Sequence, residues 1–307
     1  MYGLGGIGKS SLLYNYCKDN TCNYYDLRNA PSYKEVANWI LSNVLMNNTI
    51  APNSDNDFAL TESIRQQICS QYQDIVLIFD NLESIMETGD GCGKIKSEFS
   101  GFDSLFQLFI TNQTSSSLVL SGRERIELNF NRNDEIVYIK LSGLDGSQTK
   151  NLLISFSLSG DFNELSRKYS GNPLALKMAA STIVDNYSGN IDSFLASSEL
   201  PSSVYELFQE HFSRLDRNEI IILLWLAVVR GLCSRSEIQS KIVMAILSKN
   251  RVNSAIKNLE KRCLIENIAA STASPNLYYL QGVILEFLTD CIIESNTKPP
   301  SEMGRIE

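Results

Sequence analysis

Histidine is almost absent from this chain, because only one of its 307 residues, His211, is of this type. A hydrolase of the Ser-His-Asp or Cys-His kind would have to use His211, and a zinc site would lack its usual ligands. His211 lies in the amphipathic stretch 207–212, which is typical of a helix. We therefore expect a packed or exposed helical histidine rather than a catalytic base.

Long apolar runs and an excess of positive charge are also missing. The longest apolar run, 220–229, is too short to span a membrane, and no signal peptide opens the sequence. The net charge of −8 argues against general binding to nucleic acids or anionic membranes. Seven scattered cysteines, with Cys17 and Cys22 the closest pair, favour reduced thiols over a disulfide framework. We expect a cytoplasmic protein.

Glycine is concentrated at the start of the chain, where residues 3–10 read GLGGIGKS and fit the phosphate-loop spacing G-x-x-x-x-G-K-[ST]. Glycines let successive backbone amides turn toward phosphate oxygens at a helix N-terminus. Lys9 would reach the β- and γ-phosphates, and Ser10 would offer its hydroxyl to Mg²⁺. The alternative is a glycine-rich turn before a helix. The residues expected to bind a nucleotide here are Gly3, Gly5, Gly6, Ile7, Gly8, Lys9, Ser10 and Ser11.

The strand that usually precedes a phosphate loop has almost no room in this sequence. A phosphate loop should follow a buried strand, but only Met1 and Tyr2 precede Gly3. We expect the strand that normally presents the loop to be absent; it would normally lie centrally, beside the strand that ends at Asp80. The sequence therefore predicts a recognisable loop that is poorly anchored and binds nucleotide weakly.

Two further segments predict strands that end in charged residues. The run 74–81 is apolar on both faces and ends at Asp80, as in a central parallel strand. Ligands gather at the carboxyl ends of such strands, so Asp80 is a candidate Walker B acid that holds Mg²⁺ through water. Arg123 follows the short strand 117–121 and can point at a γ-phosphate; the alternative is a solvated surface arginine.

The order of elements predicts an α/β fold, in which a P-loop NTPase parallel sheet precedes a helical subdomain and a winged-helix domain. The domains expected are 1–140 for nucleotide binding, 141–200 for the helical subdomain, 201–295 for the winged helix and 296–307 for a tail. Helices are expected at 33–46, 64–72, 102–110, 147–157, 161–169, 171–184, 204–214, 218–229, 234–247, 251–261 and 283–293. Other strands are expected at 23–27, 136–139, 264–267 and 278–280.

These motifs together resemble, in this order, the NB-ARC domain of STAND-class signalling NTPases, and the resemblance covers nearly the whole chain. Its motifs are the phosphate loop, LRNAP at 27–31, DNLES at 80–84, SGRE at 121–124, LSGL at 141–144 and GNPLAL at 171–176. The chain looks closest to bacterial members, in which this module joins an effector or DNA-binding domain to a WD40 or TPR sensor. Neither flanking part lies in the 307 residues.

The resemblance implies roles for named residues. Lys9, Asp80 and Arg123 would be catalytic, with Arg123 similar to the sensor 1 arginine, and Pro173 would lie against the adenine. The family's Met-His-Asp motif is replaced by LQG at 280–282, so its histidine–phosphate contact is missing. Asn81 follows Asp80 where a second acid often stands, and an amide cannot act as a base. The resemblance thus implies a slow ATPase whose ADP form is closed and whose ATP form opens and assembles.

Two alternatives remain open. The chain could be a winged-helix regulator that binds DNA while its nucleotide domain serves as a scaffold, or it could be an inactive fragment. Cationic side chains gather on and beside one predicted helix, although the acidic balance counts against DNA binding. They are Lys249, Arg251, Lys257, Lys261 and Arg262.

Overall fold

The computed structural model describes residues 1–45, 56–70, 75–111, 116–128, 136–197, 200–243, 247–268 and 276–297. The chain forms two compact units. The first comprises Met1–Gly3, Lys9–Glu87 and Gly91–Leu141, and the second comprises Leu4–Gly8, Thr88–Asp90 and Ser142–Glu307. The predicted α/β class, a parallel sheet followed by helices, is confirmed; the predicted division at residue 200 stays a prediction.

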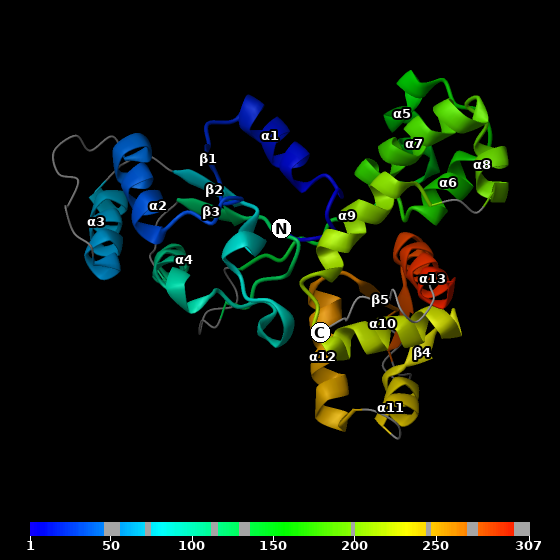
Figure 1. The fold of residues 1–307 in the computed structure, drawn as a ribbon. Helices are drawn as coiled ribbons and strands as arrows, with labels where there is room; N and C mark the ends of the chain where they lie inside the picture. Colours follow the sequence, from blue (N-terminus) through cyan, green and yellow to red (C-terminus); the bar gives the residue numbers. More distant parts are fainter. Residues whose placement is uncertain are drawn as a thin grey trace. The chain divides into compact units, whose positions relative to one another are not determined.

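The first unit is built on a parallel sheet of three strands, β1 (Asn23–Asp26), β2 (Val76–Asp80) and β3 (Ser117–Leu120), in the order β1-β2-β3 (Figure 1). Strand β2 is central, and its residues from Leu77 to Asp80 are buried. The register pairs Asp26 with Asp80. Because parallel strands end at the same edge, these two acids lie together at the carboxyl end of the sheet.

Helices of the first unit enclose an aromatic core. They are α1 (Lys9–Asp19), α2 (Tyr33–Trp39), which continues as a π-helix over Ile40–Val44, α3 (Asp57–Ser70) and α4 (Gly101–Thr111). The ring of Phe79 on β2 lies 6.2 Å from that of Phe102 and 6.1 Å from that of Phe106, both on α4. Helix α3 begins seven residues before the predicted start at 64. Most of the predicted loop 47–57 lies outside the described residues.

Tyr2 takes part in the sheet although it belongs to no strand. It forms isolated parallel bridges with Gly122 and Lys140, and its N–H donates to the carbonyl of Ile139 over 2.9 Å. The residues that lead into the phosphate loop therefore lie beside the end of β3. The place expected for the strand that normally presents the loop, beside β2, is wrong, because β1 and β3 occupy both sides of β2. The predicted strand 136–139 is also not formed; only the bridge at Lys140 remains.

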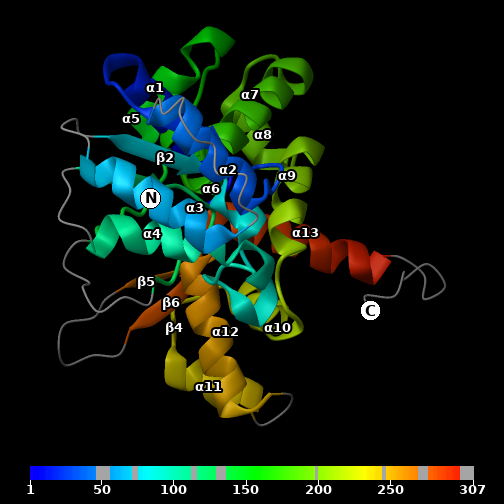
Figure 2. The ribbon, with the colours of Figure 1, turned by 90° about the vertical axis from the view of Figure 1, so that its left-hand side faces the viewer.

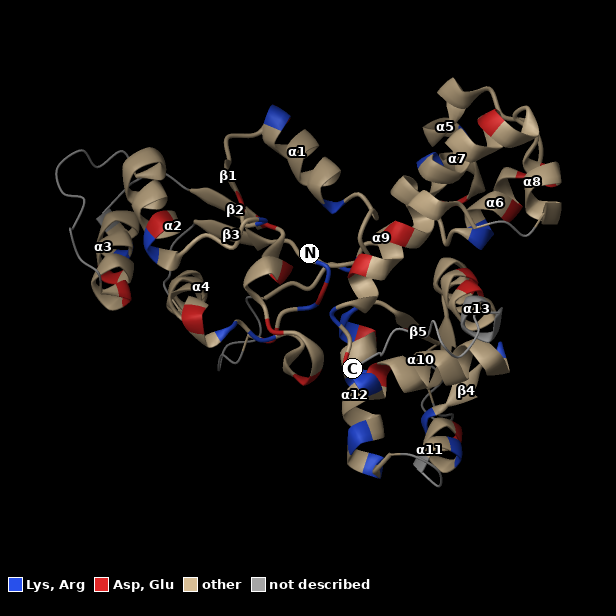
Figure 3. Cartoon of the chain, viewed as in Figure 1, with Lys and Arg blue, Asp and Glu red and all other residues tan. Residues whose placement is uncertain are grey.

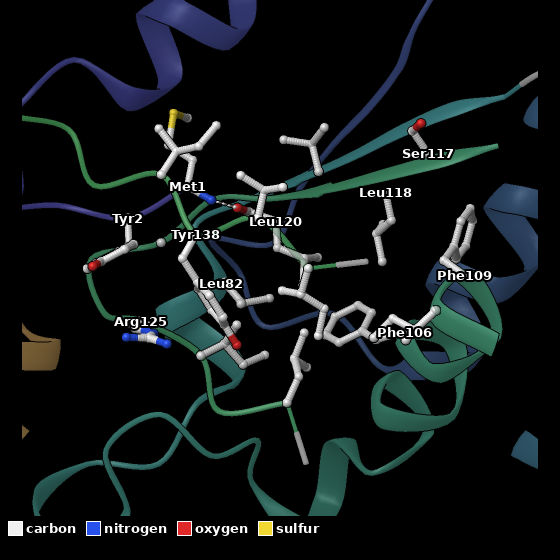
Figure 4. Close-up of a pocket in the computed structure, with 18 of the residues that line it drawn as sticks. Met1, Tyr2, Leu82, Phe106, Phe109, Ser117, Leu118, Leu120, Arg125 and Tyr138 are labelled. Carbon is white, nitrogen blue, oxygen red and sulfur yellow. Dashed lines mark hydrogen bonds between the residues drawn. The ribbon is translucent and has the colours of Figure 1, made fainter. Parts of the chain in front are cut away.

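A cavity of about 630 Å³ lies next to Met1 and Tyr2 in this unit (Figure 4). Mainly apolar side chains of β3, α4 and residues 136–139 line it, and the guanidinium of Arg125 stacks 4.0 Å above the ring of Tyr138. The backbone nitrogen of Met1 donates to the Leu120 carbonyl over 2.7 Å. None of the predicted catalytic side chains is among the lining residues, so this cavity is separate from them.

The second unit is mainly helical. Its helices are α5 (Gly146–Leu152), α6 (Phe162–Lys168), α7 (Pro173–Tyr187), α8 (Ile191–Ser197), α9 (Ser202–Phe212), α10 (Arg217–Val229), α11 (Arg235–Val243), α12 (Lys249–Lys261) and α13 (Gly282–Thr297). Capping boxes begin α5 at Asp145 and α10 at Asp216. Helix α8 was not predicted. Across the described ranges of both units, no helix is long and apolar enough to cross a membrane.

A small antiparallel sheet in the second unit has the order β4-β6-β5, from β4 (Cys233–Ser234), β6 (Leu277–Leu280) and β5 (Ile265–Ile268) (Figure 2). The predicted pair of strands at 264–267 and 278–280 is confirmed. Strand β4 was missed because two residues carry no detectable alternation. The pair follows α11 and α12 in the chain, and the winged helix itself stays a prediction.

A buried ion pair joins α10 to the end of α12. The Nε atom of Arg262 lies 3.2 Å from Oε1 of Glu219, and Arg262 also donates to the Gly89 carbonyl over 3.1 Å. Both side chains are almost fully buried, at 4% and 0% exposure. Burial raises the pKa of Glu219 to about 7, although Arg262 opposes the shift. This pair holds Gly89, from the chain segment that follows Asp80, within the second unit.

The raised pKa gives an expected pH dependence. Between about pH 4.5 and pH 7 the unfolded chain has lost the Glu219 proton while the folded chain keeps it, so stability should fall as pH rises through this window. Glu219→Gln is expected to flatten that part of the profile. Urea unfolding at a series of pH values would show it, with the exposed Glu206→Gln as a control. An unchanged slope in Glu219→Gln would contradict the assignment.

One cysteine pair departs from the expectation of reduced thiols. Cys17, near the end of α1, and Cys22, just before β1, form a disulfide with a Cα–Cα distance of 5.6 Å. The tight connection between α1 and β1 brings the two together, which spacing alone did not indicate. Cys69, Cys92, Cys233, Cys263 and Cys291 form no disulfide in the part of the chain that the structure describes.

Candidate functional site

The phosphate-loop residues have the backbone conformation that the motif predicts. Gly6 has φ +77° and Gly8 has φ +102°, values that L side chains rarely adopt, and α1 begins directly after them at Lys9. The ammonium group of Lys9 donates to the Gly3 carbonyl over 2.8 Å and is buried. The side chain of Lys9 thus folds back onto the first residue of the loop. The space beside Gly8 is open, because an added Cβ there would meet no atom within 4 Å.

The centre of the loop is anchored within the second unit. The N–H of Gly5 donates to Nε2 of His211 on α9 over 3.1 Å, and the side-chain amide of Asn172 donates to the Gly5 carbonyl over 2.8 Å. The N–H of Leu174 donates to the Gly6 carbonyl over 3.2 Å. The expectation of a poorly anchored loop is therefore wrong for Gly5 and Gly6, because side chains far along the chain supply the anchors. Weak nucleotide binding stays a prediction.

Alanine at Gly6 and at Gly8 should have different costs. Both positions carry positive φ, so each change adds backbone strain of about 1–2 kcal/mol. A Cβ on Gly6 would also lie 2.7 Å from Cβ of Leu174, whereas one on Gly8 meets open space. We expect Gly6→Ala to lower the free energy of unfolding more than Gly8→Ala, as measured by urea denaturation. Equal losses would mean that the loop does not pack on α7.

Asp80 lies at the carboxyl end of β2 and is almost fully buried. Its Oδ2 accepts from the Tyr24 hydroxyl over 2.8 Å, and its Oδ1 accepts from the N–H of Asn81 over 3.0 Å. Burial and the Asp80 carboxylate raise the pKa of Tyr24, which therefore stays a donor at neutral pH. Asn81, at φ +60°, turns away and donates its amide to Asp26 over 2.7 Å. Asp80 is thus a fixed, oriented carboxylate.

Arg123 lies just after β3 and is paired with an acid of the same unit. Its Nε is 2.9 Å from Oε1 of Glu83, and its backbone N–H donates to Oε2 of Glu83 over 3.1 Å. Its side chain is about one-fifth exposed, so it is neither a free surface arginine nor a buried one. The structure brings the SGRE and DNLES motifs into direct contact through this pair.

Pro173 occupies the first turn of α7, and Asn172 caps that helix by accepting from the N–H groups of Leu174 and Ala175. Asn172 also donates to Gly5, so the GNPLAL motif touches the phosphate loop directly. Gln281, from the LQG stretch at 280–282, donates to Glu266 on β5. Sequence reasoning missed the partnership of His211 with Gly5, and no local signal joins residues 206 positions apart.

These residues carry the kinds of groups that a nucleotide and a divalent cation bind, taken residue by residue. The loop offers the N–H groups of a helix N-terminus beside open space at Gly8, and Lys9 lies next to them. Ser10 is exposed at the start of α1, and Asp80 supplies a carboxylate. Hydroxyl and carboxylate oxygens are the ligands that Mg²⁺ prefers.

Comparison with known proteins shows one similar curated sequence. The chain is 26% identical over 335 residues to an uncharacterised WD repeat-containing protein of Nostoc sp., a match that covers 100% of this chain and 25% of that protein. The chain thus spans about a quarter of the length of the curated relative it matches. No protein-family model matches the chain.

Several solved structures are similar in fold over most of the chain. A STAND protein with a tetratricopeptide repeat sensor from Pyrococcus horikoshii matches 97% of this chain and 43% of that chain, with 16% identity and a TM-score of 0.42. The ORC2 protein of Aeropyrum pernix, in ADPNP and ADP complexes, matches 97% and 87%, with 13% identity and a TM-score of 0.47. These similarities are too distant to transfer a function.

Proposed function

We propose that this chain is the nucleotide-binding module of a STAND-class signalling NTPase of the NB-ARC type, which binds ATP and ADP and acts as a regulatory switch. One observation carries the proposal: a glycine loop with strongly positive φ at Gly6 and Gly8 enters α1 at Lys9, in a chain whose central parallel strand ends at the oriented carboxylate of Asp80. This combination of backbone amides, lysine and acid matches the chemistry of phosphate and Mg²⁺ binding.

In this proposal the residues from Gly3 to Ser11 hold the phosphates, and Lys9 neutralises their charge. Ser10 and Asp80 would hold Mg²⁺, which supplies positive charge toward the phosphate oxygens. Pro173 is the first residue of α7, and Asn172 just before it donates to the Gly5 carbonyl of the loop. This position is in keeping with a role of Pro173 near the adenine.

Hydrolysis is proposed to be slow. Asn81 carries no base, and both carboxylate oxygens of Glu83 are already engaged by Arg123. A slow hydrolase suits a switch, because the bound nucleotide persists long enough to hold one state. Differential affinity of ATP and ADP for two conformations would then shift their populations.

The proposal for the sensor and effector domains rests on the similar Nostoc sequence. The Nostoc protein carries WD repeats by its name, and this chain matches a quarter of it. We propose a repeat sensor and an effector as partners and self-assembly in the ATP state, with the winged helix, 201–295, as an internal unit.

The test is equilibrium binding of ATP and ADP, each with and without Mg²⁺, by isothermal titration calorimetry, followed by single-turnover hydrolysis. We expect both nucleotides to bind and hydrolysis to be slower than the 1–10³ s⁻¹ that is usual for enzymes, by a factor of at least about ten. Absence of binding for either nucleotide would contradict the proposal.

The DNA-binding alternative loses part of its support. Arg262 is buried in its ion pair with Glu219 and cannot face a groove. Lys249, Arg251 and Lys257 of α12 are exposed, and Figure 3 shows the Lys and Arg positions of this helix in blue. A salt-dependent gel shift with duplex DNA that disappears in Arg251→Glu would restore this alternative.

A further inference from the structure

Both backbone groups of one loop residue, Gly5, are held by side chains. The N–H of Gly5 donates to Nε2 of His211, and the Gly5 carbonyl accepts from Nδ2 of Asn172. His211 is 6% exposed and Asn172 is fully buried. These contacts lie within the second unit, to which Leu4–Gly8 belongs. Gly5 is therefore fixed by residues 167 and 206 positions away in the chain.

The geometry defines the state of each partner. Because Gly5 donates, Nε2 of His211 must be an acceptor, so the imidazole is neutral and carries its proton on Nδ1. Asn172 uses its oxygen to cap α7 and its nitrogen to hold Gly5, so its orientation is set from both sides. A Cβ on Gly5 would lie 2.1 Å from Nε2 of His211, which requires glycine at this contact.

We propose that His211 is a positioning residue for the phosphate loop: its neutral Nε2 fixes the Gly5 amide and thereby sets the loop conformation that binds nucleotide. The inference rests on the proposed function. A phosphate loop works by holding several N–H groups in one fixed arrangement, and an anchor on its third residue reduces the ordering that binding requires. The same contact links the loop to α9, so loop conformation and helix position depend on each other.

Three substitutions of His211 distinguish the effect of its hydrogen-bond acceptor from the effects of side-chain length and of packing. His211→Gln places an amide oxygen at about the reach of Nε2 and preserves the acceptor, while His211→Asn has the same chemistry at a shorter reach. His211→Leu fills the space without any acceptor. We expect the affinity for MgADP and MgATP to fall about tenfold in His211→Leu and His211→Asn, a loss that corresponds to about one hydrogen bond. In His211→Gln we expect the affinity to stay within about threefold of that of the unchanged chain.

The single histidine makes a direct measurement simple. In a tag-free sample labelled with ¹⁵N-histidine, all imidazole signals come from His211. We expect the Nδ1–H tautomer, slow exchange of the Gly5 amide proton in the unchanged chain and in His211→Gln, and fast exchange in His211→Leu. We also expect MgADP to move the Nε2 signal in the unchanged chain and not in Lys9→Ala.

The outcomes distinguish the two proposals. If the unchanged chain binds no nucleotide, the proposed function fails, and the tautomer and Gly5 exchange still decide whether His211 holds the loop. If nucleotide binds but all three variants keep the original affinity, or His211→Gln is as weak as His211→Leu, the positioning role is overturned. An Nε2–H tautomer overturns it as well, without any variant. Thermal unfolding of each variant identifies one that has simply lost its fold.

Discussion

Lys9→Ala is expected to weaken the binding of MgATP and MgADP about 10- to 150-fold. Hydrogen bonds to charged groups contribute about 1.5–3 kcal/mol each, and every 1.4 kcal/mol is a tenfold change in affinity. Lys9 is buried at the start of α1, and its ammonium already lies within the loop, on the Gly3 carbonyl. Calorimetric titration of each nucleotide would measure the change.

Lys18→Ala is the matched control. Lys18 lies on the same helix, is exposed, and contacts the ring of Tyr14 at 4.6 Å, away from the loop. It removes the same charge from the same element, so a general loss of positive charge would affect both variants. Equal affinity of Lys9→Ala and Lys18→Ala would show that the loop does not bind phosphate, and the motif would then be a structural turn.

Arg262→Met is expected to lower the free energy of unfolding by about 3–5 kcal/mol at pH 8. Removing one partner of a buried ion pair leaves the other charge without compensation, and Glu219 is fully buried. The change also removes the donor to the Gly89 carbonyl. The loss should be smaller at pH 5, because the pKa of Glu219 is raised and its neutral form carries no such penalty. Chemical denaturation at both pH values measures it.

Two further variants make that result specific. Lys249→Met changes an exposed cation on the same helix α12 and should cost little. The double variant Glu219→Gln/Arg262→Met removes both charges and should recover more than half of the loss. If Lys249→Met were as costly as Arg262→Met, or if the double variant recovered nothing, packing rather than charge would explain the destabilisation.

The central features of the site were predictable because they are local. Four glycines with Lys9 and Ser10 specify a loop that needs unusual φ values, and the structure shows these at Gly6 and Gly8. The run that ends at Asp80 predicts a buried strand through its unbroken apolar character, and β2 is central. The helices of the second unit follow from their caps and periodicity, apart from the short α8.

The errors concern which groups pair in the folded chain, whether the partners are distant in sequence or only a few positions apart. Whether residues 136–139 pair as a strand, and which strand Tyr2 lies beside, depends on neighbours that are distant in sequence. The contact of Cys17 with Cys22 depends on how the chain turns between α1 and β1. Pairing of this kind leaves no periodic signal within a short window, so pattern reasoning does not detect it.

Local patterns in the amino-acid sequence were therefore sufficient for the loop, the acid and the class of fold. The partners of these residues arise only when the chain is folded. His211 became an anchor of Gly5, Glu83 a partner of Arg123 and Glu219 a buried acid beside Arg262. Each of these contacts joins residues at least 40 positions apart. The physical reason is that backbone conformation depends on nearby residues, whereas burial and charge pairing depend on which distant elements pack together.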